Sequence, residues 1–462
     1  MTNQQLHLTI QQLEEKNEKL QEDNKTLKEE NAYLKFELEQ LKDKIYKKKG
    51  KPDNYAPPAE GLPANKRGAL FGHLGWFRKK PKHIDEIVKV ELQACPICGS
   101  NNLTECAKPK THIQQDIVFP KTKVTCYEKH LYYCQNCKKT VYGKGLNELP
   151  GSYIGPTAKA VAAWLKYHVK VSDRDIKNIF GSMFGLKITS SAILGFRSQL
   201  TKRLDYAYEG LIGKIRQSKS VHIDETGWRL NGENHWLWNF SNHKISVSHI
   251  DKSRGQKVPE KILGEKYNGI LISDFLSAYN KIKARAKQRC LVHLSRDLKK
   301  VEDCLWDDQE VQRFAGRLKN LIEYAVELSG KYNQRLISKK YFERKRDYLV
   351  KSLEDLQFQN SQHKILQRFV KRLNRHKEEI FTFLYYPGIA YHNNQAERQI
   401  RPNVLLRKIT FGNRSQEGIK NHNVLMSIIQ TTKLNRIDPL DALTKLLLAD
   451  DKAKAFTGLA PP

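Results

Sequence analysis

Apolar residues near the start of the chain recur every seven positions. The repeat consists of Leu6, Leu13, Leu20, Leu27, Leu34 and Leu41. If these leucines occupy d positions, Asn17, Asn24 and Asn31 occupy a positions, and the flanking positions pair opposite charges. Leu at d with Asn at a is typical of a parallel two-stranded coiled coil, in which buried Asn sets the register at a cost in stability. Residues 1–46 are therefore predicted to form a leucine zipper, with a single charged helix as the alternative.

The periodicity ends after this segment. Residues 47–90 are rich in Lys, Pro and Gly, which favours an extended linker and arm. Trp76 and Phe77 lie among basic residues there, a composition that suits contact with nucleic acid or a solvated linker almost equally.

Helical spacing returns in residues 146–215. Ser172 and Thr189 each stand where an N-cap is expected, and Gly185 lies in the turn between the two predicted helices. Two helices joined by such a turn are compatible with a DNA-reading helix-turn-helix, and an ordinary helical hairpin fits at least as well.

From residue 219 the apolar positions alternate. Three runs, at 220–230, 235–242 and 244–250, are separated by turn residues and predict an antiparallel meander. A helix-like segment at 254–264 and an apolar strand at 269–275 follow. Three strands, a crossover helix and a fourth strand is the order of a ribonuclease H-like α/β fold, in which the first strand lies at the sheet centre beside the fourth.

The rest of the chain has helical periodicity. Residues from about 296 to 385 are rich in Lys and Arg, and residues 393–408 also form a helical pattern, which Pro402 is expected to bend or interrupt. Residues 413–462 form a C-terminal element that contains another amphipathic helix.

Two acids end up close together in this fold. Asp224 lies in the strand V-H-I-D-E-T, and Asp274 ends the strand G-I-L-I-S-D. Each alone could be a turn or cap residue. On neighbouring strands, however, the two carboxylates would face one another, and a divalent metal ion is the usual neutraliser of such a pair.

A third carboxylate is expected from a later helix that packs on the same sheet. Glu397 is the best candidate, with Arg401 four residues later on the same helical face, where it could orient the carboxylate or contact a phosphate. Glu225 should point to the opposite sheet face, because side chains alternate along a strand. Asp297 is a further competitor, so that spacing alone leaves the third ligand open.

Charge indicates the partner. Lys and Arg number 81 against 50 Asp and Glu, a net charge of +31. Such a chain is expected to bind a polyanion, because neutralised phosphates release counterions. No apolar run reaches the length of a membrane helix, and the first residues lack the pattern of a secretory signal, which predicts a cytoplasmic protein without a membrane partner.

The cysteines predict a structural zinc ion. Cys95 and Cys98 form one C-x-x-C pair, and Cys134 and Cys137 form a second. Two such pairs can supply a tetrahedral four-thiolate site that staples a small domain, here residues 91–145. Cys106 and Cys126 are possible substitute ligands.

Several motifs together resemble one family. They are H-I-D-E-T-G-W-R-L followed by H-W-L-W, then S-D-F-L-S-A-Y, and then H-N-N-Q-A-E-R-Q-I-R-P. With the zipper-like start and the cysteine pairs, nearly the whole chain resembles the bacterial transposases of insertion sequence sixty-six, also called the TnpC type.

The resemblance implies a DDE triad at Asp224, Asp274 and Glu397 in a ribonuclease H-like core, residues 216–412, with the basic helical stretch as an insertion. It further implies two catalytic ions, Mg²⁺ or Mn²⁺, and a DNA substrate that comprises the element ends and the target. The active form would be a homodimer or a higher oligomer. The protein would be associated with the bacterial nucleoid. Accessory proteins of the same element are conceivable partners.

Four other residues would adjoin this site. Cys290 and His293 match a C-x-x-H signature of several DDE families, although a buried Cys and a core His are the default interpretation. Arg398 and Arg401, with Arg407, would hold phosphates. Two rival functions are a metal-dependent nuclease or resolvase that cuts without joining, and a DNA-binding regulator derived from a transposase.

Overall fold

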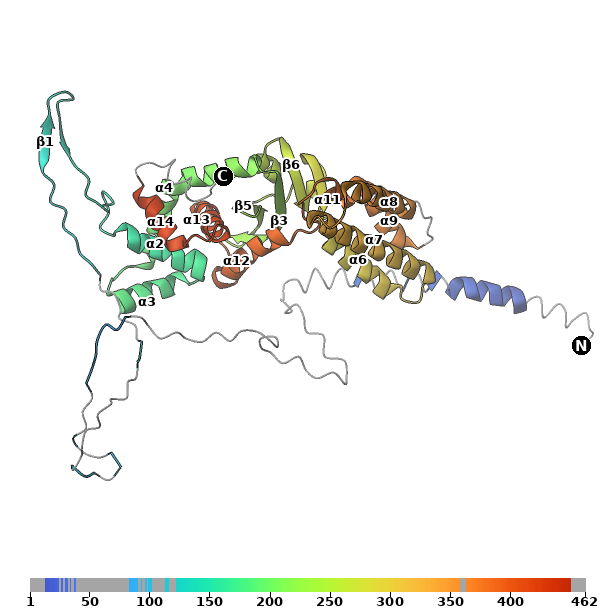
Figure 1. Cartoon of the computed structure of the whole chain (residues 1–462), viewed down its shortest axis with the longest axis horizontal. Helices are drawn as coiled ribbons and strands as arrows, with labels where there is room; N and C mark the ends of the chain where they lie inside the picture. Colours follow the sequence, from blue (N-terminus) through green and yellow to red (C-terminus); the bar gives the residue numbers. More distant parts are fainter. Residues whose placement is uncertain are drawn as a thin grey trace, which may run out of the picture. The chain divides into compact units, whose positions relative to one another are not determined.

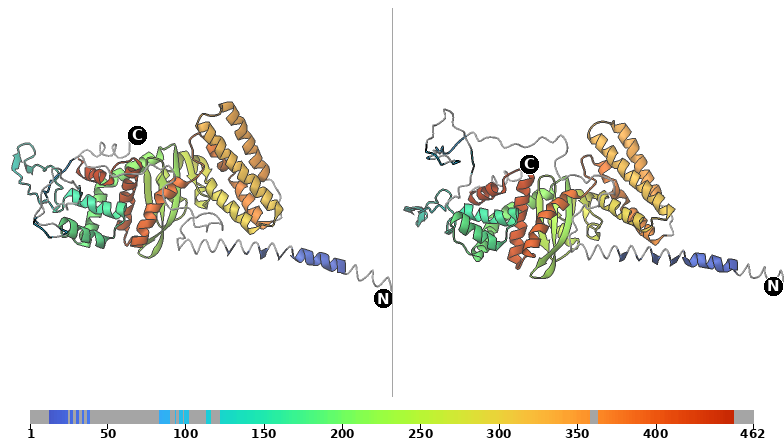
Figure 2. Two further views of the ribbon diagram at one scale, coloured as in Figure 1. Left: turned by 60° about the horizontal axis from the view of Figure 1, so that its bottom comes forward. Right: turned by 90° about the horizontal axis from the view of Figure 1, so that it is seen from below.

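The computed structural model describes part of the chain. It covers a helix over residues 13–24 with short pieces up to 38, residues 83–89, short stretches between 93 and 115, and then residues 122–357 and 363–449. The chain divides into two compact units, one of residues 1–48 with 122–462 and one of residues 49–121. The first unit contains the five-stranded sheet and every helix of the described residues (Figures 1 and 2).

The predicted helices of residues 146–215 are present. They are α2 (Pro156–Trp164), which continues as a π-helical turn (Leu165–Val169), α3 (Asp173–Phe184) and α4 (Ser190–Arg216). Both predicted caps are confirmed, because the side chain of Ser172 accepts the N–H of Asp175 and that of Thr189 accepts the N–H of Ala192. These bonds satisfy backbone donors that the first turn of each helix leaves open.

A mixed five-stranded sheet follows, in the order β5-β4-β3-β6-β7. Its strands are β3 (Ser220–Leu230), β4 (Glu233–Ser241), β5 (Ser246–Asp251), β6 (Lys266–Ser273) and β7 (Lys283–Arg289), with α5 (Lys257–Leu263) crossing between β5 and β6 and a 3-10 turn (Ser277–Tyr279) between β6 and β7. The first three strands are antiparallel, whereas β3, β6 and β7 run parallel. The predicted position of the first strand, central and beside the fourth, is confirmed.

The two faces of β3 pack against different helices. Val221 and Ile223 belong to a large core that includes residues of α2, α4, α13 (Gln416–Leu434) and α14 (Pro439–Leu448). Trp228 belongs instead to a smaller core with Ile400 of α12 (Asn394–Thr410). The even-numbered positions of β3 therefore face α12.

Helix α13 covers the β5 edge of the sheet. The N–H groups of Ser246, Ser248 and Ile250 donate to side chains of Thr431, Ser427 and Asn423, at 3.1, 2.8 and 3.0 Å. Two residues along a strand span about 6.6 Å and four along a helix about 6 Å, so each second strand donor meets each fourth helix residue. This arrangement closes an edge that would otherwise offer unpaired backbone groups.

The predicted insertion is a helical body with its own core. Its helices are α6 (Leu291–Cys304), α7 (Gln309–Asn333), α8 (Lys339–Gln357), α9 (Lys364–Arg375), α10 (Lys377–Ile380) and α11 (Thr382–Tyr385). It lies at the β7 edge (Figure 1), where the Gln288 side chain bonds to the backbone of Ile380 and Phe383 at 2.9 and 2.8 Å.

Pro402 was expected to bend or interrupt the helix of residues 393–408, and the interruption was wrong. Pro402 lies inside this helix and does not interrupt it. A proline removes a single backbone donor, and the packing of α12 against β3 and β4 holds the helix together across that position.

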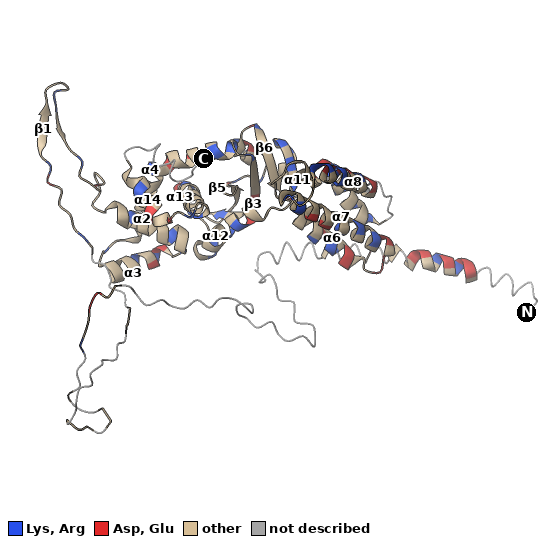
Figure 3. Cartoon of the chain, in the orientation of Figure 1, with Lys and Arg blue, Asp and Glu red and all other residues tan. Residues whose placement is uncertain are grey.

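The remaining described segments are small. A hairpin of β1 (Leu131–Cys134) and β2 (Lys139–Tyr142) carries the second cysteine pair. In the N-terminal helix, Leu13, Leu20, Leu27 and Leu34 are between 54% and 61% exposed. No helix in the described part of the chain is both long and apolar enough to cross a bilayer. Lys and Arg are spread over the helices on both sides of the sheet, with Asp and Glu between them (Figure 3).

Candidate active site

Asp224 lies in the middle of β3, on the face covered by α12. It is half-buried and stands opposite Asn239 in the β3–β4 register. Burial raises the pKa of this carboxyl well above its usual value, and the neighbouring carboxylates of Glu225, Asp274 and Glu397 raise it further. Asp224 therefore sits in a negative environment, as expected of a cation site.

Asp274 directly follows β6, at its carboxyl end. Its Oδ1 accepts the N–H of Leu276 at 2.9 Å, so that the side chain shapes the turn that leaves the strand. The fully buried Arg289 donates to the Asp274 carbonyl at 2.7 Å and to Glu379 of α10 at 2.5 Å. The buried guanidinium of Arg289, which is paired with Glu379, therefore fixes the backbone of this turn.

Glu397 lies in the first turn of α12, with its side chain 36% exposed. Its Oε1 is 3.9 Å from Nδ1 of His293. That nitrogen is buried and has no hydrogen-bond partner among the described residues. His293 therefore lies next to Glu397, and its role at the site stays a prediction.

The predicted arginines behave differently from one another. Arg398 and Arg401 are exposed, and no ion pair joins Arg401 to Glu397 within the described residues. Arg407 is turned inward, because its Nη1 donates to the carbonyl of Gly227 and contacts Oγ1 of Thr226 at 3.4 Å. Arg407 thus ties α12 to β3, and the expectation that it holds phosphate stays a prediction.

Both competitors for the third carboxylate have partners elsewhere. Glu225 accepts from Arg254 at 2.7 Å and from the Tyr279 hydroxyl, and Tyr279 belongs to the core on the other sheet face. Asp297 forms an ion pair with Arg372 at 2.7 Å inside the insertion. Glu225 points away from Asp224, as predicted, and Asp297 is a salt-bridge partner.

The three carboxylates are neighbours, but they do not close into one coordination shell. Among the described residues, no three His, Cys, Asp or Glu side chains form a group that could hold a metal ion. The chemistry of the donors nevertheless fits a hard divalent cation, which prefers carboxylate oxygens. The raised pKa of Asp224 also reflects negative charge that such a cation would offset.

A buried amide that sequence reasoning did not single out connects these elements. Asn393 is fully buried, and its Nδ2 donates to the carbonyl of Ile223 at 2.8 Å, one residue before Asp224. Its backbone N–H donates to Sγ of the buried Cys290 at 3.2 Å. The only sequence signal was its place in the motif H-N-N-Q-A-E-R, four residues before Glu397.

Two of the four predicted zinc ligands, Cys134 and Cys137, lie in the described residues. Cys134 ends β1 and Cys137 lies in the turn of the β1–β2 hairpin, where the Lys138 N–H donates to the Cys134 carbonyl at 2.9 Å. Hydrogen bonds from the Cys137 backbone and side chain, and from the Asn136 backbone, lower the pKa of Cys134. Cys95, Cys98 and Cys106 lie outside the described residues.

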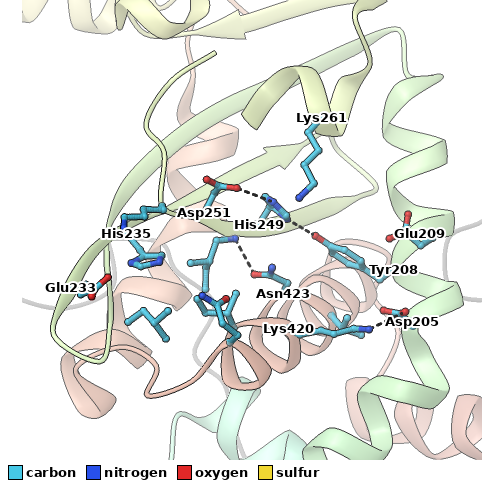
Figure 4. Close-up of a pocket in the computed structure, with 16 residues that line it drawn as sticks. Asp205, Tyr208, Glu209, Glu233, His235, His249, Asp251, Lys261, Lys420 and Asn423 are labelled. Carbon is cyan, nitrogen blue, oxygen red and sulfur yellow. Dashed lines mark hydrogen bonds and ion pairs between the residues drawn. The ribbon is translucent and has the colours of Figure 1, made fainter. Parts of the chain in front are cut away.

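A separate cleft of about 590 Å³ opens beside the β5 edge. Its lining includes Tyr208 of α4, His235 and His249 of the sheet, and Asn423 of α13 (Figure 4). None of the three candidate carboxylates lines this cleft. Burial lowers the pKa of His249 to about 4, so the ring is neutral at physiological pH.

A central mixed sheet covered by helices defines a class of α/β proteins, and here three acids from β3, the end of β6 and the start of α12 lie near one another. The family is more specific. The sequence model of the Transposase IS66 family matches residues 151–421, and the chain belongs to this family. The match spans α2 to the first part of α13 and includes Asp224, Asp274 and Glu397. A comparison with curated proteins gives no match.

Proposed function

We propose that this chain is a DDE transposase that cleaves the ends of an insertion sequence and joins them to target DNA. The family match supports transposition as the process. The observation that carries the chemistry is the neighbourhood of Asp224, Asp274 and Glu397, which come from a central strand, the adjacent parallel strand and a covering helix.

We further propose that the sheet is the core of a ribonuclease H-like fold. Support comes from its strand order, in which three antiparallel strands are followed by a crossover helix, a fourth strand parallel to the first and beside it, and a fifth strand parallel to the fourth. In open sheets of this kind, ligands bind outside the carboxyl ends of the strands, and Asp274 occupies such an end.

In this mechanism the three carboxylates would hold two divalent ions, Mg²⁺ or Mn²⁺. When bound, such ions activate a water or a DNA 3′-OH and stabilise the leaving oxygen. The protein contributes the positions of the carboxylates and a nearby imidazole, His293, beside Glu397. Arg398 and Arg401, exposed on the same helix, would bind phosphates without reading bases.

The decisive test compares two acidic residues in a strand-transfer assay on DNA that carries the element ends. Asp224→Asn keeps the shape of the side chain but loses its charge, so cleavage and joining should fall by at least about 1,000-fold, the scale of an essential electrostatic group. Asp297→Asn is the control, because Asp297 is paired with Arg372 inside the insertion.

Three outcomes would contradict the proposal. Retained joining by Asp224→Asn would mean that the chemistry does not depend on Asp224. Absence of both cleavage and joining in the unaltered chain would favour a DNA-binding regulator. Cleavage by the unaltered chain without joined product would favour a nuclease or resolvase. Asp297→Asn checks the assay itself, because an equal loss in this variant would mean that the assay reports on folding instead of chemistry.

We also propose a structural zinc ion held by Cys95, Cys98, Cys134 and Cys137. The hydrogen bonds that lower the pKa of Cys134 favour its thiolate, which is the form that binds metal. Metal analysis of the purified chain should find about one zinc per chain. Cys137→Ser should lose this zinc, whereas Cys126→Ser should keep it; the reverse result would make Cys126 the ligand.

A further inference from the structure

We propose that Asn393 is a positioning residue that sets the spacing of the three carboxylates. It does so through a node, by which we mean the set of hydrogen bonds that its side-chain amide and its backbone make. This inference rests on the proposed function, because it assumes that Asp224, Asp274 and Glu397 act together. Asn393 is not one of the carboxylate residues, and it is fully buried.

The node forms where the sheet opens. The parallel pairing of β3 with β6 ends at His222 and Ile272, just before the two aspartates. Beyond that point the Ile223 carbonyl has no partner on β6, and a buried carbonyl without a partner is costly. Nδ2 of Asn393 fills this place at 2.8 Å and so fixes the backbone next to Asp224.

Backbone bonds extend the node to the other two acids. The N–H of Cys290 donates to the carbonyl of Ser273 at 2.8 Å, directly before Asp274, while Sγ of Cys290 accepts the Asn393 N–H. The N–H of Glu397 donates to the carbonyl of Asn393 at 3.3 Å. Each carboxylate residue is therefore bonded to this node itself or through its immediate chain neighbour.

Asn393 does not act as a helix cap through its side chain. Asn is common at helix N-caps because its side chain accepts an N–H of the first turn. Asn393 stands at the N-cap of α12, yet its side chain makes no such bond. Its amide is directed across to β3, with Nδ2 at Ile223 and Oδ1 3.3 Å from Nδ1 of His222. An amide meets both demands, because it has both a donor and an acceptor.

The test measures Mn²⁺ binding to the zinc-loaded full chain by titration calorimetry, alongside thermal unfolding. Asn393→Ala should raise the Mn²⁺ dissociation constant about 10-fold, the size typical when a residue that supports metal ligands is removed. The matched control is Asn403→Ala. Asn403 is equally buried in the same helix, and its amide bonds to Gln399 and His422 at 3.0 and 2.7 Å, away from the carboxylates. It should lose stability but bind Mn²⁺ within about twofold of the unaltered chain, because its partners contact no ligand.

Cys290 supplies a second pair of variants if Asn393→Ala does not fold. Cys290→Ser keeps an acceptor for the Asn393 N–H and should bind Mn²⁺ nearly normally, whereas Cys290→Val removes the acceptor and should weaken binding. Equal Mn²⁺ affinity in Asn393→Ala and the unaltered chain, or in the two Cys290 variants, would overturn the positioning role.

Failure of this inference is distinguishable from failure of the proposed function. Asp224→Asn should abolish Mn²⁺ binding at the site whatever Asn393 does. If Asp224→Asn binds Mn²⁺ and joins DNA normally, the carboxylate mechanism itself is wrong. If Asp224→Asn fails while Asn393→Ala binds Mn²⁺ normally, only the role of Asn393 is wrong.

Discussion

At the scale of single residues, burial shifts the pKa of acids and the pKa of histidines in opposite directions. It raises the pKa of Asp224, which disfavours the charged carboxylate, and it lowers the pKa of His422 to about 3, which disfavours the imidazolium. The desolvation of a charged group is costly in both cases. Asp224 lies among other carboxylates in the proposed site, whereas His422 is a core residue that stays neutral and bonds to Asn403 at 2.7 Å.

His422 predicts a loss of stability in mild acid. Its folded pKa of about 3 lies below the ordinary value of 6.5, so the unfolded chain binds a proton first as the pH falls. The stability that this residue contributes is present above pH 6.5 and is lost between pH 6.5 and about 3. Between pH 7 and pH 5 the loss should be about 2 kcal/mol in the free energy of unfolding.

Denaturant unfolding of the chain at the two pH values measures this loss. His422→Gln keeps a donor for Asn403 and does not titrate, so its stability should change less over the same range. If the variant and the unaltered chain lose the same free energy, other groups cause the acid sensitivity.

At the scale of elements, two helices hold the sheet from different sides. Helix α12 is bonded to β3 at both ends, through Asn393 at its start and through the turn after it, where Trp228 donates to Asn413 at 2.8 Å. Gly412 makes this turn possible, because its φ is +103° and a Cβ there would lie 2.3 Å from the Arg229 carbonyl. Helix α13 satisfies the backbone donors of β5.

Removing one hydrogen-bond acceptor of α13 should lower the stability of the chain, because this helix pairs with the β5 edge of the sheet. In Ser427→Ala the buried N–H of Ser248 loses its partner, which should lower the free energy of unfolding by about 1–3 kcal/mol. Ser182→Ala makes the same change at an exposed site on α3, where the hydroxyl bonds only to Asn178 of its own helix, and should alter stability by less than about 0.5 kcal/mol. Equal effects in the two variants would mean that the bond to β5 contributes nothing.

At the scale of the whole molecule, one core joins segments that are far apart in sequence. Leu204 of α4, Val221 of β3 and Leu443 of α14 belong to the same cluster. The N-terminal helix differs, because its d-position leucines remain exposed in a single chain. A heptad seam that is uncovered in one chain is expected to be buried against a second copy.

The zipper predicts a dimer that charged d positions should dissociate. Leu20→Glu combined with Leu27→Glu places like charges in the seam, so the mass from light scattering at micromolar concentration should fall from two chains to one. Lys19→Glu with Thr26→Glu adds acidic residues outside the seam and should leave the dimer intact. A dimer that survives the Leu20 and Leu27 changes would have its interface elsewhere.

Much of the fold was predictable because it depends on short-range patterns. The alternation in β3 and β4, the caps Ser172 and Thr189 and the helical insertion all follow from local periodicity and capping chemistry. The site was predictable only in part. Asp224 and Asp274 follow from strand order. Spacing alone leaves the third carboxylate open between Glu397 and Asp297, because helix packing is not encoded in spacing, and only the family motif favours Glu397.

The sequence by itself determined the elements, the net charge of +31, the family motifs and the pairing of the strands that carry the first two aspartates. Only the tertiary structure decided that Arg407 bonds to β3, that α13 closes the β5 edge and that Asn393 links the three carboxylate residues. The physical reason is that these are hydrogen bonds between side chains and the backbone of distant segments. Periodicity reports which face of an element is apolar, but it does not report which polar side chain will meet an open backbone group.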